Sequence, residues 1–346
     1  MSNWQQYSNK FRETALEHGF DDEYIQACLN YALPLYEKGL PVIYDQEHLA
    51  KLVGYQLLYL LAASHSAPKF YRFFTLSKKA GGERQIAEPL PSLKEIQRWI
   101  LDNILYRCET SRFAKGFIPE VSIRDNARFH RNQPQVLSLD IKDFFPSIKI
   151  GRVFNFFRKL GYQKDVLYLL THLCVLNKSL PQGAPTSPAL SNLIVLRMDR
   201  RLSGFALKEK IRYTRYADDI TFSGELNPGR IIKFVRRVIA DEGLELNEAK
   251  TRLMQRHQRQ EVTGIVVNEK LQAPRRDRRE LRKVLYFIEK YGLDSHIRRT
   301  QSLKSNYVKH LLGVANFFLF INPNDREAKR AVEVLHRLLM KIGGLQ

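Results

Sequence analysis

The residues of clearest chemical interest are three aspartates in two separate segments. Asp218 and Asp219 are adjacent at the tip of an expected β-hairpin over residues 211–223, and Asp140 lies near the end of an apolar, strand-like run over residues 136–141. Carboxylates that converge from two strand ends are stable mainly when a hard cation neutralises them, and Mg²⁺ favours carboxylates combined with substrate phosphates. The pattern therefore favours a two-metal site for in-line phosphoryl transfer. The alternative interpretation is an ordinary Asp-rich turn.

The charge of the chain indicates a polyanionic partner. Its 346 residues include 56 Lys and Arg against 36 Asp and Glu, a formal net charge of +20 at pH 7. Such an excess suits nucleic acid or an anionic membrane surface. The most apolar segments, residues 52–63 and 311–321, are shorter than the roughly 20 residues of a membrane-spanning helix, and residues 1–20 are too polar for a signal peptide. Nucleic acid is therefore the expected partner, with no membrane.

The elements that must position the aspartates include helices and short strands, and the 44% hydrophobic content permits a sizeable core. Residues 1–65 show apolar positions at helical spacing. Two β-prone runs around paired glycines predict a hairpin over residues 71–87. Ser187 is expected to cap a helix over residues 187–202. Further helices are expected over residues 92–106, 153–160, 165–176 and 230–242, short strands around Leu253 and over residues 262–267, and a basic helical region from Pro274 onward.

Three further blocks accompany the Asp218–Asp219 pair in a fixed order. The pair lies in the block YADD at residues 216–219. The other three blocks read DIKDFF at 140–145, LPQGAPTSP at 180–188 and LNEAKT at 246–251. With these blocks the chain resembles a reverse transcriptase of the bacterial branch near the group II intron enzymes, from about residue 71 to residue 264 and more loosely to the C-terminus. The blocks correspond to the palm motifs A, B, C and D of that family, and the paired-glycine hairpin corresponds to its fingers.

Two shorter motifs resemble those of retron reverse transcriptases. Asn126 and His130 match an N-A-x-x-H element before motif A, and Val262, Thr263 and Gly264 match a V-T-G element after motif D. Taken alone, His130 would be a packed helix histidine and the second motif an ordinary strand end. In their expected places the two motifs favour the retron branch, and the resemblance places these five residues among those that contact RNA or DNA.

The resemblance implies an α+β fold, a right-hand polymerase with fingers, a palm built on an antiparallel sheet, and a helical thumb. The expected domains are a helical N-terminal extension over residues 1–65, fingers and palm over residues 66–270, and a basic thumb over residues 271–346. The three cysteines form no C-x-x-C pair, which favours a reducing cytosol, and the expected location is the bacterial cytoplasm.

By the same resemblance, Asp140, Asp218 and Asp219 hold two Mg²⁺ ions, with Mn²⁺ as a substitute, and the Ile141 carbonyl assists. Asp143 competes with Asp140 for this role, but it follows the strand end, where a turn or capping residue is the better interpretation. Lys250 matches the motif D lysine, a candidate proton donor to the leaving pyrophosphate. The alternative for this lysine is a solvated side chain.

The resemblance also assigns residues that bind the incoming dNTP. Lys78 and Arg84 would bind its triphosphate, with Lys79 as the alternative to Lys78, since Lys and Arg donate hydrogen bonds to phosphate oxygens. Gln182 and Gly183 match the motif B loop that packs against the nucleotide, where a glycine permits close approach of the backbone.

Phe145 lies five residues after Asp140, where the family places its steric gate. A bulky ring under the sugar would clash with a 2′-hydroxyl and so select deoxynucleotides. The alternative is a core aromatic, a role that suits the neighbouring Phe144.

The C-terminal region is basic and amphipathic. Residues 275–304 contain ten Lys or Arg and four Asp or Glu, and Leu281, Val284, Leu285 and Ile288 form one apolar stripe. Arg275, Arg279 and Arg282 fall largely outside the stripe. The alternatives are a solvated helix face and a surface that contacts a nucleic-acid backbone, and the charge excess favours the second.

A retron enzyme would reverse transcribe a partner structured non-coding RNA into DNA. The resemblance implies synthesis from dNTPs, primed at a guanosine 2′-hydroxyl of that RNA, and a branched RNA–DNA product. It also implies a defence operon against phage with an effector protein. Two alternatives remain, another bacterial defence or intron-derived reverse transcriptase with different priming, and a non-catalytic RNA-binding scaffold on the same fold.

Overall fold

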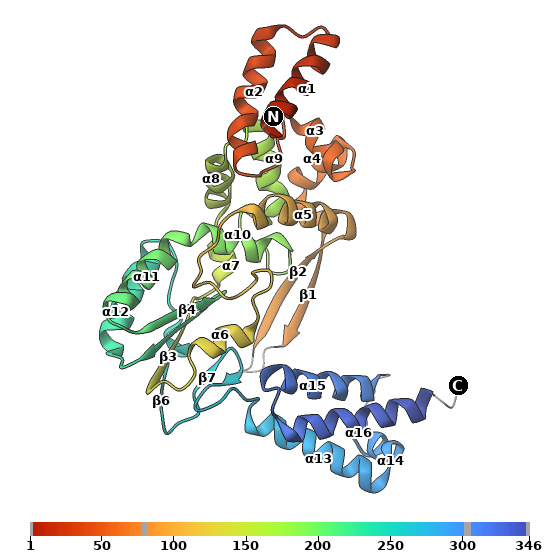
Figure 1. Ribbon diagram of the computed structural model, residues 1–346, viewed down its shortest axis with the longest axis vertical. Helices are drawn as coiled ribbons and strands as arrows, with labels where there is room; N and C mark the ends of the chain where they lie inside the picture. Colours follow the sequence, from red (N-terminus) through yellow and green to blue (C-terminus); the bar gives the residue numbers. More distant parts are fainter. Residues whose placement is uncertain (1–2, 78–81, 301–305, 344–346) are drawn as a thin grey trace. The chain divides into compact units, whose positions relative to one another are not determined.

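The computed structural model describes residues 3–77, 82–300 and 306–343 (Figure 1). These residues form two compact units. The first unit comprises Met1–Glu120, Ile141–Ser203 and Phe234–Asn247, and the second comprises Val121–Asp140, Gly204–Lys233 and Glu248–Gln346. No helix within the described ranges is long and apolar enough to cross a membrane.

The first unit is mainly helical. Its elements are α1 (Asn3–Glu17), α2 (Asp22–Glu37), α3 (Gln46–Val53), α4 (Leu57–His65), η1 (Ala67–Phe70), β1 (Tyr71–Ser77), β2 (Glu83–Pro89), α5 (Pro91–Asn103), η2 (Leu105–Arg107), α7 (Phe144–Ser147), α8 (Ile150–Leu160), α9 (Lys164–Cys174) and α10 (Thr186–Ile194). Helices α11 (Leu196–Lys208) and α12 (Pro228–Ala240) contribute residues to both units. The helices predicted for residues 1–65 are confirmed as α1 to α4.

The predicted hairpin of the first unit is confirmed. Strand β1 pairs antiparallel with β2, with Tyr71 opposite Pro89 and Ser77 opposite Glu83. Arg84 is exposed on β2. Lys78, Lys79 and the first glycine of the pair lie outside the described residues.

The predicted cap of the helix over residues 187–202 is wrong. Two helices, α10 and α11, cover this segment, and α10 begins at Thr186 with Pro185 as its N-cap. Pro185 has φ of −57° and ψ of −34°. Its ring fixes φ near the helical value, and its ψ is also helical. The helix therefore begins before Ser187 can act as a cap.

The second unit contains a four-stranded antiparallel sheet in the order β4-β5-β3-β6. Its elements are α6 (Ile123–Phe129), β3 (Gln135–Asp140), β4 (Arg212–Tyr216), β5 (Asp219–Gly224), η3 (Glu248–Lys250), β6 (Arg252–Gln255), β7 (Glu261–Val262), β8 (Ile265–Val266), α13 (Arg275–Tyr291), α14 (Leu293–Thr300), α15 (Tyr307–Ile321) and α16 (Arg326–Gly343). Val136 and Leu137 on β3 point to opposite faces and are both fully buried. The central strand is therefore covered on both faces.

The C-terminal helices of the second unit share one hydrophobic core with its sheet region. Val136 and Val262 belong to the same buried cluster as Leu285 on α13, Phe318 on α15 and Leu335 on α16. The amphipathic pattern read from residues 281–288 is confirmed, because Leu281, Leu285 and Ile288 are the buried residues of α13.

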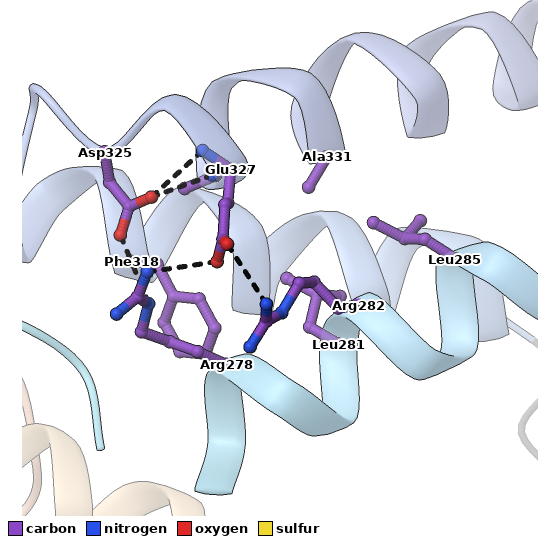
Figure 2. A pocket seen from close by; sticks show the side chains of 9 residues that line it. Arg278, Leu281, Arg282, Leu285, Phe318, Asp325, Glu327 and Ala331 are labelled. Atoms are coloured by element: carbon purple, nitrogen blue, oxygen red, sulfur yellow. Dashed lines mark hydrogen bonds and ion pairs between the residues drawn. The ribbon is translucent and has the colours of Figure 1, made fainter. Parts of the chain in front are cut away.

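Ion pairs tie α13 to the start of α16 (Figure 2). Oδ1 of Asp325 accepts hydrogen bonds from the backbone N–H groups of Glu327 and Ala328 at 3.1 and 3.2 Å. Arg278 lies 3.5 Å from Asp325 through Nε and 3.0 Å from Glu327 through Nη2. A carboxylate at a helix N-terminus is stabilised by the helix dipole, so this cluster stabilises both the helix start and the helix pair.

Candidate active site

The β3–β5 pairing places the two aspartate segments opposite each other. Asp140, the last residue of β3, pairs with Asp219, the first residue of β5. Residues opposite each other in an antiparallel pair have Cα atoms about 4.5–5.5 Å apart. Asp218 immediately precedes β5, in the turn that follows β4. The expected convergence of carboxylates from two strand ends is confirmed for Asp140 and Asp219.

The turn between β4 and β5 is tight and has an internal support. Ala217 has φ of 55°, in the left-handed region that a β-carbon disfavours. Arg215 is fully buried and donates a hydrogen bond from Nη1 to the Ala217 carbonyl oxygen at 2.9 Å. Hydrogen bonds from a charged donor are stronger than neutral ones, so Arg215 stabilises the turn that carries Asp218.

Lys250 completes this group of residues. It is the last residue of η3, and its Nζ lies 2.7 Å from Oδ2 of Asp140. The Asp140 side chain is 8% exposed and the Lys250 side chain 56%, so the amine reaches a buried carboxylate from the surface. Asp140, Asp218, Asp219 and Lys250 are called the carboxylate cluster below.

The electrostatics of the carboxylate cluster are those of crowded negative charge. Burial and the charges of Asp218 and Asp140 raise the pKa of Asp219 from 3.8 to about 6, and the Lys250 ammonium opposes this rise. The hydrogen bond to Asp140 raises the pKa of Lys250 above its ordinary 10.5. Lys250 is therefore protonated at neutral pH, and Asp219 loses its proton near pH 6.

The donor atoms of the cluster suit a hard divalent cation. Three carboxylates supply oxygen ligands, which Mg²⁺ and Mn²⁺ prefer. The pKa of Asp219 is raised first by burial and then by the charges of Asp218 and Asp140, and a cation would offset that charge. Across the described ranges, no three His, Cys, Asp or Glu side chains are already grouped as a metal-ligand set. The Ile141 backbone forms a β-bridge with Leu246. The cluster thus fits the ion in charge and atom type, while Lys250 engages one of the carboxylates.

The motif B glycine packs against the β1–β2 hairpin of the first unit. Gly183 has φ of +133°, and a β-carbon there would lie 2.5 Å from the Ala87 carbonyl oxygen. The Ala87 N–H donates a hydrogen bond to the Gln182 carbonyl oxygen at 2.9 Å. Both the backbone angle and the close approach exclude any side chain at residue 183.

The two phenylalanines after motif A differ in burial. Phe144 is 3% exposed, which confirms its interpretation as a core aromatic, and Phe145 is half-buried. The Phe145 ring lies 6.5 Å from that of Phe117, edge to face. Asp143 is exposed with φ of 44°, and its carbonyl oxygen accepts a hydrogen bond from the Ser147 N–H. The turn interpretation of Asp143 is confirmed.

The N-A-x-x-H motif forms a chain of buried hydrogen bonds with the sheet. His130 Nδ1 lies 2.7 Å from Ser223 Oγ on β5, and His130 Nε2 lies 2.7 Å from Thr214 Oγ1 on β4. Thr214 Oγ1 donates to Asn126 Oδ1 at 2.6 Å, and Asn126 Nδ2 donates to Thr263 Oγ1 at 3.5 Å. Asn126, His130, Thr214 and Ser223 are called the buried network below.

The buried network fixes the protonation of its histidine. Burial and the nearby charge of Arg212 lower the pKa of His130 to about 3, so the ring is neutral. Thr214 uses its one hydroxyl proton on Asn126. His130 must therefore donate from Nε2 to Thr214 and accept at Nδ1 from Ser223.

The V-T-G motif forms the turn of the β7–β8 hairpin. Thr263 has φ of 47° and Gly264 φ of 81°, the pair of positive angles typical of a two-residue type I′ turn. Thr is β-branched and disfavours this region. Val262 is 2% exposed in the core, whereas Gly264 is exposed. Of the motif residues, Asn126, His130 and Val262 are buried against protein atoms, and Gly264 presents the most open surface.

The predicted basic residues of α13 have different surroundings. Arg275 and Arg279 are exposed. Arg282 is 54% exposed and lies 3.3 Å from Glu327 (Figure 2). Part of the charge of Arg282 therefore stabilises the helix pair.

Three residues of this unit were missed by sequence reasoning. Arg215, Thr214 and Ser223 lie on β4 and β5 and are fully buried. The sequence does contain an indication of their role, because charged or polar side chains inside a predicted half-buried hairpin require hydrogen-bond partners. The sequence did not show which partners they have.

Known proteins are similar to this chain along most of its length. Residues 76–267 match the family model described as reverse transcriptase (RNA-dependent DNA polymerase). The Retron Ec86 reverse transcriptase of Escherichia coli is 33% identical over 88% of this chain and 92% of that protein. The Retron Mx65 reverse transcriptase of Myxococcus xanthus is 34% identical over 84% of this chain and 71% of that protein. Among solved structures, telomerase from Candida albicans aligns with a TM-score of 0.43 at 10% identity, over 78% of this chain and 63% of that one.

Proposed function

This chain belongs to the reverse transcriptase family and is a retron-type RNA-directed DNA polymerase, and we propose that it copies a partner structured non-coding RNA into branched RNA–DNA. Synthesis begins at a guanosine 2′-hydroxyl of that RNA and consumes dNTPs. The observation that carries the catalytic part is the pairing of Asp140 with Asp219, with Lys250 at 2.7 Å from Asp140.

In this proposal Asp140, Asp218 and Asp219 hold the divalent cations, with the Ile141 carbonyl assisting, and Mg²⁺ is the natural ion with Mn²⁺ as a substitute. Two such ions, when bound, activate the primer hydroxyl and offset negative charge on the transferred phosphoryl group. The raised pKa of Asp219 supports this assignment, because the carboxylate is buried and lies near the charges of Asp218 and Asp140.

Lys250 is the proposed proton donor of the reaction. As the bond between the α-phosphorus and pyrophosphate breaks, its ammonium gives a proton to the leaving oxygen. Its raised pKa keeps it charged at neutral pH, and its 56% exposed side chain leaves room to move from Asp140 to the pyrophosphate.

The nucleotide-binding roles are proposed for residues of the first unit. Arg84 and Lys78 bind the triphosphate, and the loop of Gln182 and Gly183 packs against the nucleotide. The exposed position of Arg84 on β2 supports its role, as does the close backbone packing at Gly183.

Phe145 is the proposed gate against ribonucleotides. Its half-buried ring supports the role, since Phe144 already fills the core. Phe145→Ala removes the ring that would clash with the 2′-hydroxyl of GTP. The preference for dGTP over GTP is therefore expected to fall by at least about tenfold, which corresponds to about 1.4 kcal/mol of lost discrimination. Single-nucleotide insertion assays measure the ratio, with Phe144→Leu as the control for general damage. An unchanged ratio removes Phe145 as the gate.

The proposed domains follow the family plan, with a helical extension over residues 1–65, fingers and palm over residues 66–270 and a thumb over residues 271–346. Arg275, Arg279 and Arg282 contact the nucleic-acid backbone in the thumb. Gly264 and Thr263 contact RNA at the β7–β8 turn, and the buried Asn126, His130 and Val262 support that turn from inside.

The cellular role is proposed as defence against phage in the bacterial cytoplasm, with an effector protein from the same operon. This proposal rests on the retron assignment, which the retron reverse transcriptases among the relatives support.

The test is to isolate the nucleic acid that co-purifies with the protein from its native locus. After RNase digestion, a denaturing gel is run with and without a 2′,5′-debranching enzyme. A discrete DNA whose mobility shifts on debranching is expected. DNA without a branch would move the enzyme to a class with different priming. RNA without DNA, even after addition of dNTPs and Mg²⁺, would favour the non-catalytic scaffold.

A further inference from the structure

Helix α13 carries a second apolar stripe beside the one that its core uses. Leu281, Leu285 and Ile288 are buried, whereas Val284, Phe287 and Tyr291 follow one another at helical spacing on an adjacent face. Phe287 is half-buried and Tyr291 is 54% exposed. This second stripe therefore leaves large apolar surface open to solvent.

The second stripe forms one wall of a groove between α13 and α14. The groove is partly open to solvent, has a volume of about 410 Å³ and is also lined by Ser295, His296 and Arg299 of α14. Pockets of about 300–1,000 Å³ with aromatic walls and a few polar groups are typical sites for small planar ligands. The groove therefore has the size and lining of a site for one nucleobase.

The two aromatic rings of the groove are held in place. The rings of Phe287 and Tyr291 are stacked, with centroids 5.9 Å apart and planes 26° apart. The Arg299 guanidinium lies 5.5 Å from the Phe287 centroid. His296 Nε2 is 2.9 Å from the Tyr307 hydroxyl, which ties α14 to α15. A preformed stacking surface loses little conformational entropy when a ligand binds.

The groove is lined by two cations and one carboxylate, Glu280, so its charge favours an anionic ligand. Lys283 and Arg299 belong to its lining, and the Lys290 ammonium lies 5.2 Å from the Tyr291 ring centroid. Cations beside aromatic rings are the combination by which proteins bind single-stranded nucleic acid, with phosphates on the cations and bases on the rings.

We propose that this groove between α13 and α14 binds one unpaired nucleobase of the RNA partner by stacking on Tyr291. The inference rests on the proposed RNA partner and goes beyond contact with the RNA backbone. Ser295 and Glu280, which also line the groove, supply a hydroxyl and a carboxylate that can meet the edge of the base. Unpaired bases are accessible for such stacking, whereas bases within a duplex are not.

The chain offers a matched control on the same helix. Tyr286 is 54% exposed, like Tyr291, and Lys290 lies 5.5 Å from its ring, but Tyr286 does not line the groove. Tyr291→Ala and Tyr286→Ala therefore remove equal rings at equal exposure, and they differ in contact with the groove.

The experiment measures binding of the full chain to a fluorescent oligouridylate and to a blunt RNA duplex of equal length, by anisotropy at several salt concentrations. Tyr291→Ala is expected to weaken oligouridylate binding by about tenfold and to leave duplex binding unchanged. Tyr286→Ala is expected to leave both unchanged. The salt dependence should stay the same for Tyr291→Ala, because no charge is removed, and become shallower for Arg299→Gln.

Tyr291→Phe keeps the ring and is expected to bind like the wild type, which separates stacking from loss of the hydroxyl. Equal effects of Tyr291→Ala and Tyr286→Ala on oligouridylate binding would overturn the proposal. An absence of any effect of Tyr291→Ala would also overturn it, and this is the result expected if the groove binds a protein side chain instead of a base. The experiment measures RNA binding and not DNA synthesis. If the protein proves unable to synthesise DNA but Tyr291→Ala still weakens oligouridylate binding, the catalytic proposal is contradicted and the groove proposal is not.

Discussion

The carboxylate cluster and the buried network both include residues of the β4–β5 hairpin, but one group is charged and the other is neutral. Asp219 begins β5, and Ser223 lies four residues further along the strand, about 13 Å away at the rise of a strand. The cluster holds three negative groups against one lysine, partly open to solvent. The network holds neutral groups that satisfy one another and are almost fully buried.

The difference shows how one hairpin combines stability with function. The network contributes to folding, because each buried polar group has a partner. The cluster opposes folding, because like charges are held close together until a cation neutralises them. Substitutions in the two groups should therefore separate stability from catalysis.

The largest effect is expected from the double substitution Asp218→Ala with Asp219→Ala. DNA synthesis on a primed RNA template should fall by at least about 1,000-fold, since the metal-binding charge is lost, and RNA binding should remain. The exposed Asp143→Ala is the matched control and should keep full activity. Retained synthesis in the double variant would remove the metal assignment.

Substitution in the network should act on stability. His130→Ala leaves the hydroxyls of Thr214 and Ser223 without their partner and opens a cavity, at a cost of about 3 kcal/mol in the free energy of unfolding. Urea unfolding measures this change, with the exposed His257→Ala as the control. A free energy of unfolding that is equal for His130→Ala and His257→Ala would show that the network contributes nothing to the fold.

The network should also make stability depend on pH. The pKa of His130 is lowered from 6.5 to about 3 in the folded state, so between these values the unfolded chain binds a proton that the folded chain does not. Stability should therefore fall as pH decreases from 6.5 towards 3, by up to about 1.4 kcal/mol per pH unit. His130→Gln should lose this contribution, and parallel pH profiles of the two proteins would contradict it.

Within the cluster, Lys250 should affect the rate more than binding. Lys250→Met is expected to slow single-turnover nucleotide addition by about 100-fold, in the range for loss of a general acid, with little change in dNTP affinity. Lys142→Met, which removes a half-exposed lysine paired with Glu245, is the control. An unchanged rate would leave Lys250 as a counter-charge for Asp140 alone.

The smallest expected effect is a gain in stability. The pKa of Asp219 is raised from 3.8 to about 6 in the folded state, so the folded protein loses stability as pH rises through this window. Asp219→Asn removes the charge and should stabilise the metal-free protein by about 2 kcal/mol at pH 8. The gain should shrink by pH 5. Thermal unfolding in EDTA measures it, and a loss of stability at pH 8 would show that the cluster does not oppose folding.

The sequence was sufficient to predict the strands and helices around the site and the carboxylate chemistry of the site. The strand-like flanks of the Asp218–Asp219 tip predicted the hairpin over residues 211–223, and the apolar run before Asp140 predicted β3. The amphipathic stripe of α13 was also predicted. These features depend on neighbours along the chain, where the period of side chains is a reliable signal.

Two other features were not predicted, one for a local reason and one because it depends on a distant segment. The start of α10 moved because Pro185 already has helical angles, a local effect that the Ser187-Pro188 pattern obscured. Gly183 requires glycine because the Ala87 carbonyl lies where its β-carbon would be, and this neighbour comes from another hairpin.

The sequence by itself determined that three aspartates, a motif B loop and a lysine occur in the order of a reverse transcriptase. Only the tertiary structure decided that Lys250 pairs with Asp140 and that His130 is buried between Thr214 and Ser223. Residue types and local periodicity specify strands and turns. Strand register and side-chain partners depend on how segments about 80 to 110 residues apart pack together.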